Sequence, residues 1–184
     1  MTLIATPGQT VGPFFHDGLS YDGEADLVPP GSPGSLVLHG RVLDGGGDGV
    51  PDALVEIWQA RPDGTVPREP GSIRRDGRTF TGFGRAATTA DGRYAFSTLP
   101  PGPAEPGRAA FFAVTVFARG LLNRLFTRAY LPDDEAALAA DPLLSSLPAG
   151  RRRTLIARRD DRGLVFDIRL QGGDETVFLR FPDR

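Results

Sequence analysis

Glycine and proline divide this chain into short apolar segments, and that division constrains its fold more than any other feature. The 184 residues include 24 glycines and 17 prolines, which disfavour long helices and are typical of turns between strands. Between the turns, segments such as "SLVLHGRVLD" (35–44) and "DALVEIWQA" (52–60) alternate apolar and polar residues. Seven or more short segments of this kind predict an all-β fold, a β-sandwich.

The length is typical of one domain, which we expect to span residues 1–184. Residues 1–34 are rich in glycine and proline and predict an extended N-terminal arm, whereas residues 35–184 predict the sandwich. Phe14 and Phe15 would be costly to leave in water, so we expect the arm to lie against another surface. A short helical segment is predicted within 133–148, where "EAALAA" follows two capping aspartates and Pro142 ends it.

Two further patterns predict strands. "GRAATTADGRYAFSTL" (84–99) has the form of strand, turn and strand. "RRTLIARRDDRGLVFDIRL" (152–170) and "ETVFLRF" (175–181) predict three more strands, the first two joined at 161–163. Trp58 is expected to pack in the core or at an interface.

The composition excludes several function classes. The chain has no cysteine or lysine, which excludes thiolate catalysis, cysteine-based metal sites and Schiff-base chemistry. The formal charge of −2 argues against nucleic acid as a partner. No segment has the length of a membrane span and the N-terminus lacks a signal-peptide pattern, so we expect no membrane association and a cytoplasmic protein.

Catalytic motifs are scarce. There is no phosphate-binding glycine loop, no dinucleotide fingerprint and no Gly-x-Ser-x-Gly sequence. The two histidines, His16 and His39, are expected to be structural residues held by hydrogen bonds. The aspartate pairs 133–134 and 160–161 fall where caps or turns explain them. Taken alone, the residues indicate a β-sandwich without an evident active site.

A family resemblance extends over nearly the whole chain. "GRVLDGGGDGVPDALVEIWQARPDG" (40–64), "FTGFGRAATTADGRYAFSTLPPGP" (80–103) and "FARGLLNRLFTRAYLPDDE" (117–135) occur in that order, after "TPGQTVGPFF" (6–15). Together they resemble the intradiol ring-cleavage dioxygenases. The resemblance implies a β-sandwich and a non-haem Fe(III) that two tyrosines and two histidines hold.

The same resemblance locates the positions of those four ligands. The first tyrosine would follow Trp58 by eight residues, and the second would follow the "PGP" turn. The histidines would alternate on the strand within "AAFFAVTVFARG" (109–120), on the side expected to face inward. The corresponding residues of this chain are Val66, Ala104, Phe111 and Ala113. None of them offers a lone pair to hard Fe(III).

The resemblance therefore implies an iron-free chain that pairs with a homologous chain bearing the iron. The complex would cleave a small aromatic diol with O₂. This chain would supply part of the substrate cavity: Arg119 to attract a ring carboxylate, with Thr10, Gly12 and Pro13 forming one wall. The chain alone would hold no metal and no catalytic residue.

Two alternatives remain open from the sequence. Arg119 and the segment 10–13 could be ordinary structural features, in which case the chain is a non-catalytic β-sandwich used for binding or assembly. A self-sufficient enzyme would have to use Tyr21, Tyr94 and Tyr130 with the two histidines, although the resemblance gives these residues no common centre.

Overall fold

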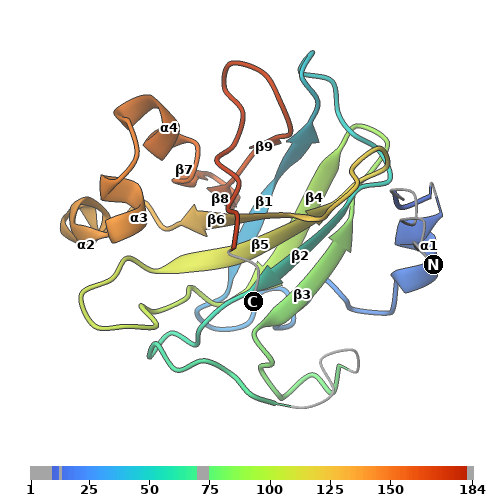
Figure 1. Ribbon diagram of the computed structural model, residues 1–184. Helices are drawn as coiled ribbons and strands as arrows, with labels where there is room; N and C mark the ends of the chain where they lie inside the picture. Colours follow the sequence, from blue (N-terminus) through green and yellow to red (C-terminus); the bar gives the residue numbers. More distant parts are fainter. Residues whose placement is uncertain (1–9, 13, 70–74, 182–184) are drawn as a thin grey trace, which may run out of the picture.

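Two β-sheets packed face to face form the body of the protein (Figure 1). The computed structural model describes residues 10–12, 14–69 and 75–181. The strands are β1 (Leu36–Leu43), β2 (Leu54–Trp58), β3 (Phe83–Ala87), β4 (Arg93–Thr98), β5 (Phe111–Phe117), β6 (Leu125–Tyr130), β7 (Arg158–Asp160), β8 (Gly163–Val165) and β9 (Ile168–Arg169). The helices are α1 (Phe15–Leu19), α2 (Glu135–Ala140), α3 (Pro142–Ser145) and α4 (Ala149–Arg153). The predicted all-β sandwich is confirmed.

The first sheet has the order β4-β1-β8-β7, and β9 also pairs with β1. The second has the order β3-β2-β5-β6, in which every pair is antiparallel. The predicted segment 84–99 does form strand, turn and strand. However, β3 and β4 belong to different sheets, so the turn joins the two layers and does not close a hairpin.

The core lies between the two sheets and consists of the inward residues of both. Along β5, the buried residues Phe112, Val114 and Val116 alternate with less buried ones. Phe111 and Ala113 therefore point away from the core between the sheets, which corrects the expectation that they face inward. Phe111 packs instead against Tyr130, which belongs to a second buried cluster. The side chains of any β-strand alternate between its two faces, so this period alone does not tell which of the two sets of residues is buried in the core.

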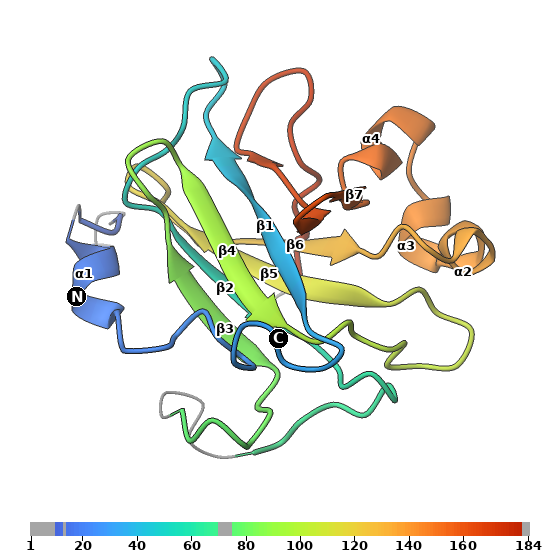
Figure 2. The same cartoon turned by 180° about the vertical axis from the view of Figure 1, so that it is seen from behind.

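Helices α2, α3 and α4 follow β6 along the chain and lie beside one end of the sandwich, whereas α1 precedes β1 and lies on the opposite side (Figure 2). Asp134 caps α2 by accepting a hydrogen bond from the N–H of Ala137, as the sequence predicted. Pro142 does not end the helical segment: it is the first residue of α3, which Asp141 caps. Proline is favoured at the first position of a helix because a backbone N–H there has no hydrogen-bond partner within the helix, so its absence costs nothing.

The last third contains less strand than the sequence predicted. Arg152 and Arg153, predicted to begin a strand, are instead the last residues of α4, which follows Pro148. "ETVFLRF" forms a single bridge, in which the N–H of Leu179 donates to the carbonyl of Phe126 at 2.7 Å. The predicted strands within 158–169 are present as β7, β8 and β9.

The arm is not wholly extended, because it contains α1. Phe15 packs against Phe117, with ring centroids 5.4 Å apart, whereas Phe14 is 77% exposed. Within this chain the arm therefore covers Phe15 but leaves Phe14 exposed. Among the residues that the structure describes, no helix is long and apolar enough to cross a lipid bilayer.

Candidate functional site

An apolar cavity of about 160 Å³ lies where β5 begins and β2 ends. The four residues that stand in place of the implied iron ligands come together in its wall. The lining residues are Trp58, Gln59, Ala60, Val66, Gly102, Ala104, Phe111 and Ala113. We call this the apolar cavity.

Strand pairing and a close backbone approach build this cavity. Trp58 is the direct partner of Ala113 across β2 and β5, which places both side chains on one face of the sheet. Gly64, at φ +86°, brings the loop of Val66 against the carbonyl of Pro103; a Cβ on Gly64 would lie 2.3 Å from that oxygen. This contact holds the loop that contains Val66 against the turn that contains Ala104. Trp58 is 46% exposed at its rim, so it is not a core residue.

The wall of the apolar cavity offers no ligands for Fe(III). Val66, Ala104, Phe111 and Ala113 present hydrocarbon only. The one polar side chain, Gln59, is engaged elsewhere: its amide nitrogen donates to the carbonyl of Leu99 at 2.8 Å, and its oxygen accepts from the Thr98 hydroxyl. Ferric iron requires anionic oxygen and imidazole ligands. These residues therefore do not fit the metal.

The tyrosine and histidine side chains that the structure describes do not provide another centre. The buried Tyr94 hydroxyl donates to the carbonyl of Phe166, and burial raises the pKa of this phenol. Tyr130 lies between Arg128 and Asp141, and its pKa is likewise raised by burial.

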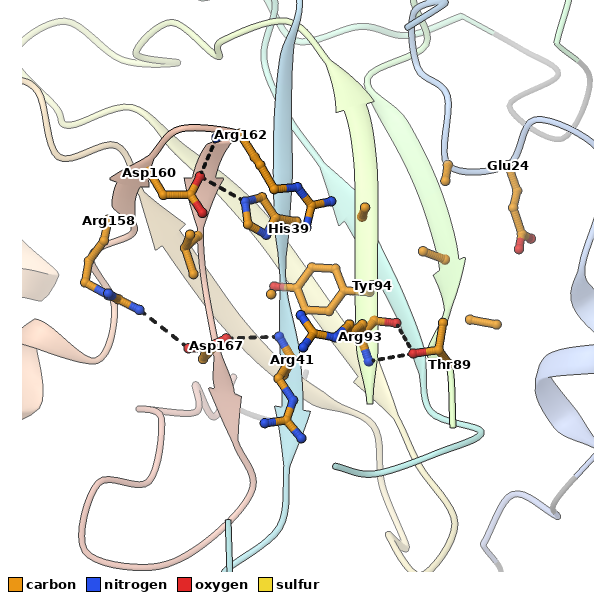
Figure 3. Close-up of a pocket in the computed structure, with 16 residues that line it drawn as sticks. Glu24, His39, Arg41, Thr89, Arg93, Tyr94, Arg158, Asp160, Arg162 and Asp167 are labelled. Carbon is orange, nitrogen blue, oxygen red and sulfur yellow. Dashed lines mark hydrogen bonds and ion pairs between the residues drawn. The ribbon is translucent and has the colours of Figure 1, made fainter. Parts of the chain in front are cut away.

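His39 lines the same groove as Tyr94 (Figure 3), but the Tyr94 hydroxyl is engaged by the carbonyl of Phe166. Tyr21, within the arm, lies near Arg75 and Arg85. His39 pairs with Asp160 on the first sheet, and the side chain of His16 lies outside the described residues. Within the described part of the chain, no three His, Cys, Asp or Glu residues are grouped as metal ligands would be.

The second candidate region lies at the opposite end of β5, where the arm contacts the turn between β5 and β6 (Figure 1). The hydroxyl oxygen of Thr10 accepts a hydrogen bond of 2.9 Å from the N–H of Gly120, the residue after Arg119. A hollow of about 600 Å³ opens beside them, with Val11, Phe117 and Leu122 among its lining residues. This hydrogen bond places Thr10 next to the turn that carries Arg119, although the two residues are far apart in the sequence. Pro13 lies outside the described residues.

Among the residues that the structure describes, Arg119 has one carboxylate neighbour. Its guanidinium lies 3.2 Å from the carboxylate of Asp52, which is mostly buried, whereas the arginine side chain is 55% exposed. A guanidinium has five N–H donors, so this contact leaves others directed to solvent. At Gly12, a Cβ would meet no atom of the described chain within 4 Å, so no close approach within this chain requires glycine there.

The apolar cavity and Arg119 are far apart. Ala113 and Phe111 begin β5, whereas Arg119 follows its last residue, Phe117. At about 3.3 Å per residue, the strand from Ala113 or Phe111 to Phe117 alone spans about 13 to 20 Å, and Arg119 lies two residues beyond it in a turn. A small aromatic molecule cannot contact both at once.

The sequence is similar to those of known dioxygenases over most of its length. A family model described as "Dioxygenase" matches residues 11–172. The protocatechuate 3,4-dioxygenase alpha chain of Burkholderia cepacia is 42% identical, and the alignment covers 97% of this chain and 98% of that protein. The beta chain from the same organism is 34% identical over 94% of this chain and 78% of its own length.

A solved structure supports the same relationship. It is the dioxygenase domain of a dioxygenase–carbohydrate-binding protein fusion from Streptomyces sp. SirexAA-E, with a TM-score of 0.56 and 27% identity. The match covers 91% of this chain and 99% of that one. The sandwich described above is therefore shared with proteins whose sequences have diverged widely.

Proposed function

Since this chain belongs to the intradiol ring-cleavage dioxygenase family, a family that uses non-haem Fe(III), we propose that it is the iron-free α chain of a protocatechuate 3,4-dioxygenase. In the complex, a homologous β chain holds the ferric ion. The complex adds both atoms of O₂ to protocatechuate and breaks the bond between the two hydroxylated carbons, giving 3-carboxy-cis,cis-muconate.

The observation that carries this proposal is the wall of the apolar cavity. The four positions implied for iron ligands lie together, and all four are hydrocarbon. A chain of this kind keeps the fold of the family but leaves metal binding to a partner. The similarity to both an alpha and a beta chain agrees with a pair of homologous subunits.

The distance along β5 supports a site shared between chains. Arg119 lies beyond the far end of β5, about 13 to 20 Å of strand from this chain's own apolar cavity, and Thr10 lies beside its turn, so neither reaches a substrate held in that cavity. A substrate in another chain's site suits both residues. Exposed apolar side chains at this end, Phe14 at 77% and Leu122 at 67%, suit burial against a partner.

In the proposed complex, the residues of this chain bind and orient the substrate. Protocatechuate carries a ring carboxylate, which the guanidinium of Arg119 can attract and hold by charge-assisted hydrogen bonds. Thr10 holds the arm against the turn that carries Arg119, and Gly12 allows substrate or partner backbone to approach closely.

A second candidate function rests on the ion pair between Arg119 and Asp52. If that pair only stabilises the turn, the chain is a scaffold that shapes the complex without touching the substrate. The effect of replacing Arg119 on the KM for protocatechuate separates the two functions.

The proposal is tested by expressing this chain alone, the partner alone and both together, and by measuring O₂ uptake with protocatechuate. We expect no uptake from this chain alone and full uptake only from the complex. Uptake by this chain in isolation would contradict the proposal.

A further inference from the structure

Asp52 adopts a backbone conformation that residues with a side chain rarely take. Its φ is +56°, and in the part of the chain that the structure describes it is the one residue other than glycine with a positive φ. Pro51 precedes it in the turn before β2, and a positive φ directly after proline is typical of a type II turn, which favours glycine or asparagine at that position. The aspartate is therefore explained by what its carboxylate does and not by the needs of the backbone.

The turn does not depend on the side chain of Asp52. The hydroxyl of Thr88, a buried residue directly after β3, donates to the carbonyl of Val50 at 2.9 Å and accepts from the N–H of Ala53 at 2.9 Å. The N–H of Thr88 also donates to the carbonyl of Ala53 at 2.8 Å. These bonds hold the chain on both sides of Asp52, so the turn should keep its shape when the carboxylate is removed.

The carboxylate of Asp52 contacts Arg119. The Asp52 side chain is only 14% exposed, and its one partner within the described residues is the Arg119 guanidinium, whose Nη2 lies 3.2 Å from Oδ2. A carboxylate that is largely removed from water is costly unless a cation is paired with it. The pair therefore fixes one nitrogen of the guanidinium, whereas the Arg119 side chain remains 55% exposed.

Asp52 is the one described residue that holds the charged end of Arg119 in place. The N–H of Gly120, the next residue, donates to the hydroxyl oxygen of Thr10 at 2.9 Å, which fixes the backbone of the turn. An arginine side chain has several rotatable bonds, however, so a fixed backbone does not fix its guanidinium. Without Asp52, a carboxylate that binds Arg119 would first have to immobilise this side chain.

We propose that Asp52 is a positioning residue for Arg119. This inference rests on the proposed function, in which Arg119 binds the ring carboxylate of protocatechuate. Asp52 holds Nη2, and Nε and Nη1 remain free of described partners to donate to the substrate. The negative charge of Asp52 opposes the charge of the substrate, so Asp52 improves binding by fixing the geometry of Arg119 and not by adding attraction.

The test is the steady-state kinetics of D52G in the assembled complex, with protocatechuate and with catechol. Glycine removes the carboxylate and adopts a positive φ without strain. Immobilising a flexible side chain on binding corresponds to about a 2- to 12-fold loss of affinity, so the KM for protocatechuate should rise by about that factor. The kcat should not change, and neither should the KM for catechol, which has no carboxylate.

Thermal denaturation separates positioning from a structural role. The Tm of D52G should be equal to or above that of the wild type, because no bond that holds the turn is lost and a side chain at positive φ is removed. An ion pair that serves only stability would give a lower Tm with an unchanged KM. D52N tolerates a positive φ and keeps an oxygen acceptor for Arg119, so its KM should lie between those of the wild type and D52G.

A double variant tests whether Asp52 acts through Arg119. If it does, D52G should raise the KM for protocatechuate no further when Arg119 is already replaced by alanine. D133N is the matched control, because Asp133 is also paired with an arginine, Arg159, at 2.6 Å. Asp133 follows the end of β6 that pairs with the start of β5, so it lies away from Arg119 and its loss should leave the KM unchanged.

The outcomes distinguish this inference from the proposed function. An unchanged KM for protocatechuate in R119A would overturn both. A raised KM in R119A together with an unchanged KM in D52G would overturn the positioning role of Asp52 alone. A rise in D52G that is as large for catechol, or that persists in the R119A background, would overturn that role as well.

Discussion

The hydroxyl oxygen of Thr10 accepts a hydrogen bond from the N–H of Gly120, a residue 110 positions further along the chain. This bond joins the N-terminal arm to the turn that carries Arg119. It explains how a segment rich in glycine and proline, with little regular structure, is held beside the one arginine that we propose to contact the substrate.

Replacing Thr10 by valine removes the acceptor of this bond while keeping the shape of the side chain. A hydrogen bond of this kind contributes about 1 kcal/mol, which corresponds to about a fivefold change in local opening. We therefore expect the Gly120 amide to exchange with solvent about fivefold faster in T10V, as measured by hydrogen exchange. T10S keeps the hydroxyl and should exchange as the wild type does; equal rates in all three proteins would show that the bond does not hold the arm.

Arg119→Ala tests the proposed contact with substrate in the α/β complex. The loss of one charge-assisted hydrogen-bonding group costs about 1.5 to 3 kcal/mol, so the KM for protocatechuate should rise about 10- to 150-fold. Catechol lacks the ring carboxylate, so its KM should change little. Steady-state kinetics with both substrates measure this difference.

The control for that experiment is R108A, which removes an exposed arginine from another loop. An intact complex with an unchanged KM for protocatechuate in R119A would favour the scaffold function. An equal rise in KM for both substrates would show that Arg119 acts on the shape of the site and not on the carboxylate.

Phe112 tests the assignment of the two faces of β5. It is fully buried, so Phe112→Ala should lower the free energy of unfolding by about 3 to 5 kcal/mol, as measured by urea denaturation. Phe112→Leu, which leaves a smaller cavity, should cost less. The control L122A removes an exposed side chain and should change stability by no more than about 0.5 kcal/mol. A loss in L122A that equals the loss in F112A would contradict this assignment.

Asp76 provides a pH-dependent prediction. The Thr79 hydroxyl and the N–H groups of Thr79 and Arg78 donate to its carboxylate, which lowers its pKa from 3.8 to about 2. A carboxyl with a lowered pKa contributes stability above pH 3.8, and this contribution is lost as the pH falls through about 2. T79A should move the Asp76 pKa toward 3.8, whereas T79S should not.

An NMR titration of the Asp76 carboxyl carbon measures this shift directly. In unfolding experiments, T79A should be less stable than the wild type at neutral pH, and the difference should shrink below pH 2. A wild-type midpoint near 3.8 would contradict the hydrogen bonding described for this loop.

The sequence predicted the sandwich because its strands have a clear two-residue period, and it predicted the ligand positions through the family resemblance. It could not tell which face of β5 is buried, since Phe111, Phe112, Ala113 and Val114 are all apolar. It missed α4 because "RRRTLI" suits either a helix or a strand until Pro148 fixes the preceding turn.

The contacts of the candidate site were less predictable than its residues. The pairing of Arg119 with Asp52 joins the turn after β5 to the loop before β2, and no local pattern signals a contact of that separation. The pairing of Arg41 with Arg93 was not predicted either, because only the register of β1 with β4 places these two residues opposite each other.

The iron content of the separated chains tests the central claim most directly. The two chains should be purified from one complex under conditions that retain the metal, and each analysed for iron. The account predicts that iron accompanies the partner chain alone and that this chain contains none. Stoichiometric iron bound to this chain, in which Val66, Ala104, Phe111 and Ala113 line the apolar cavity, would contradict the account.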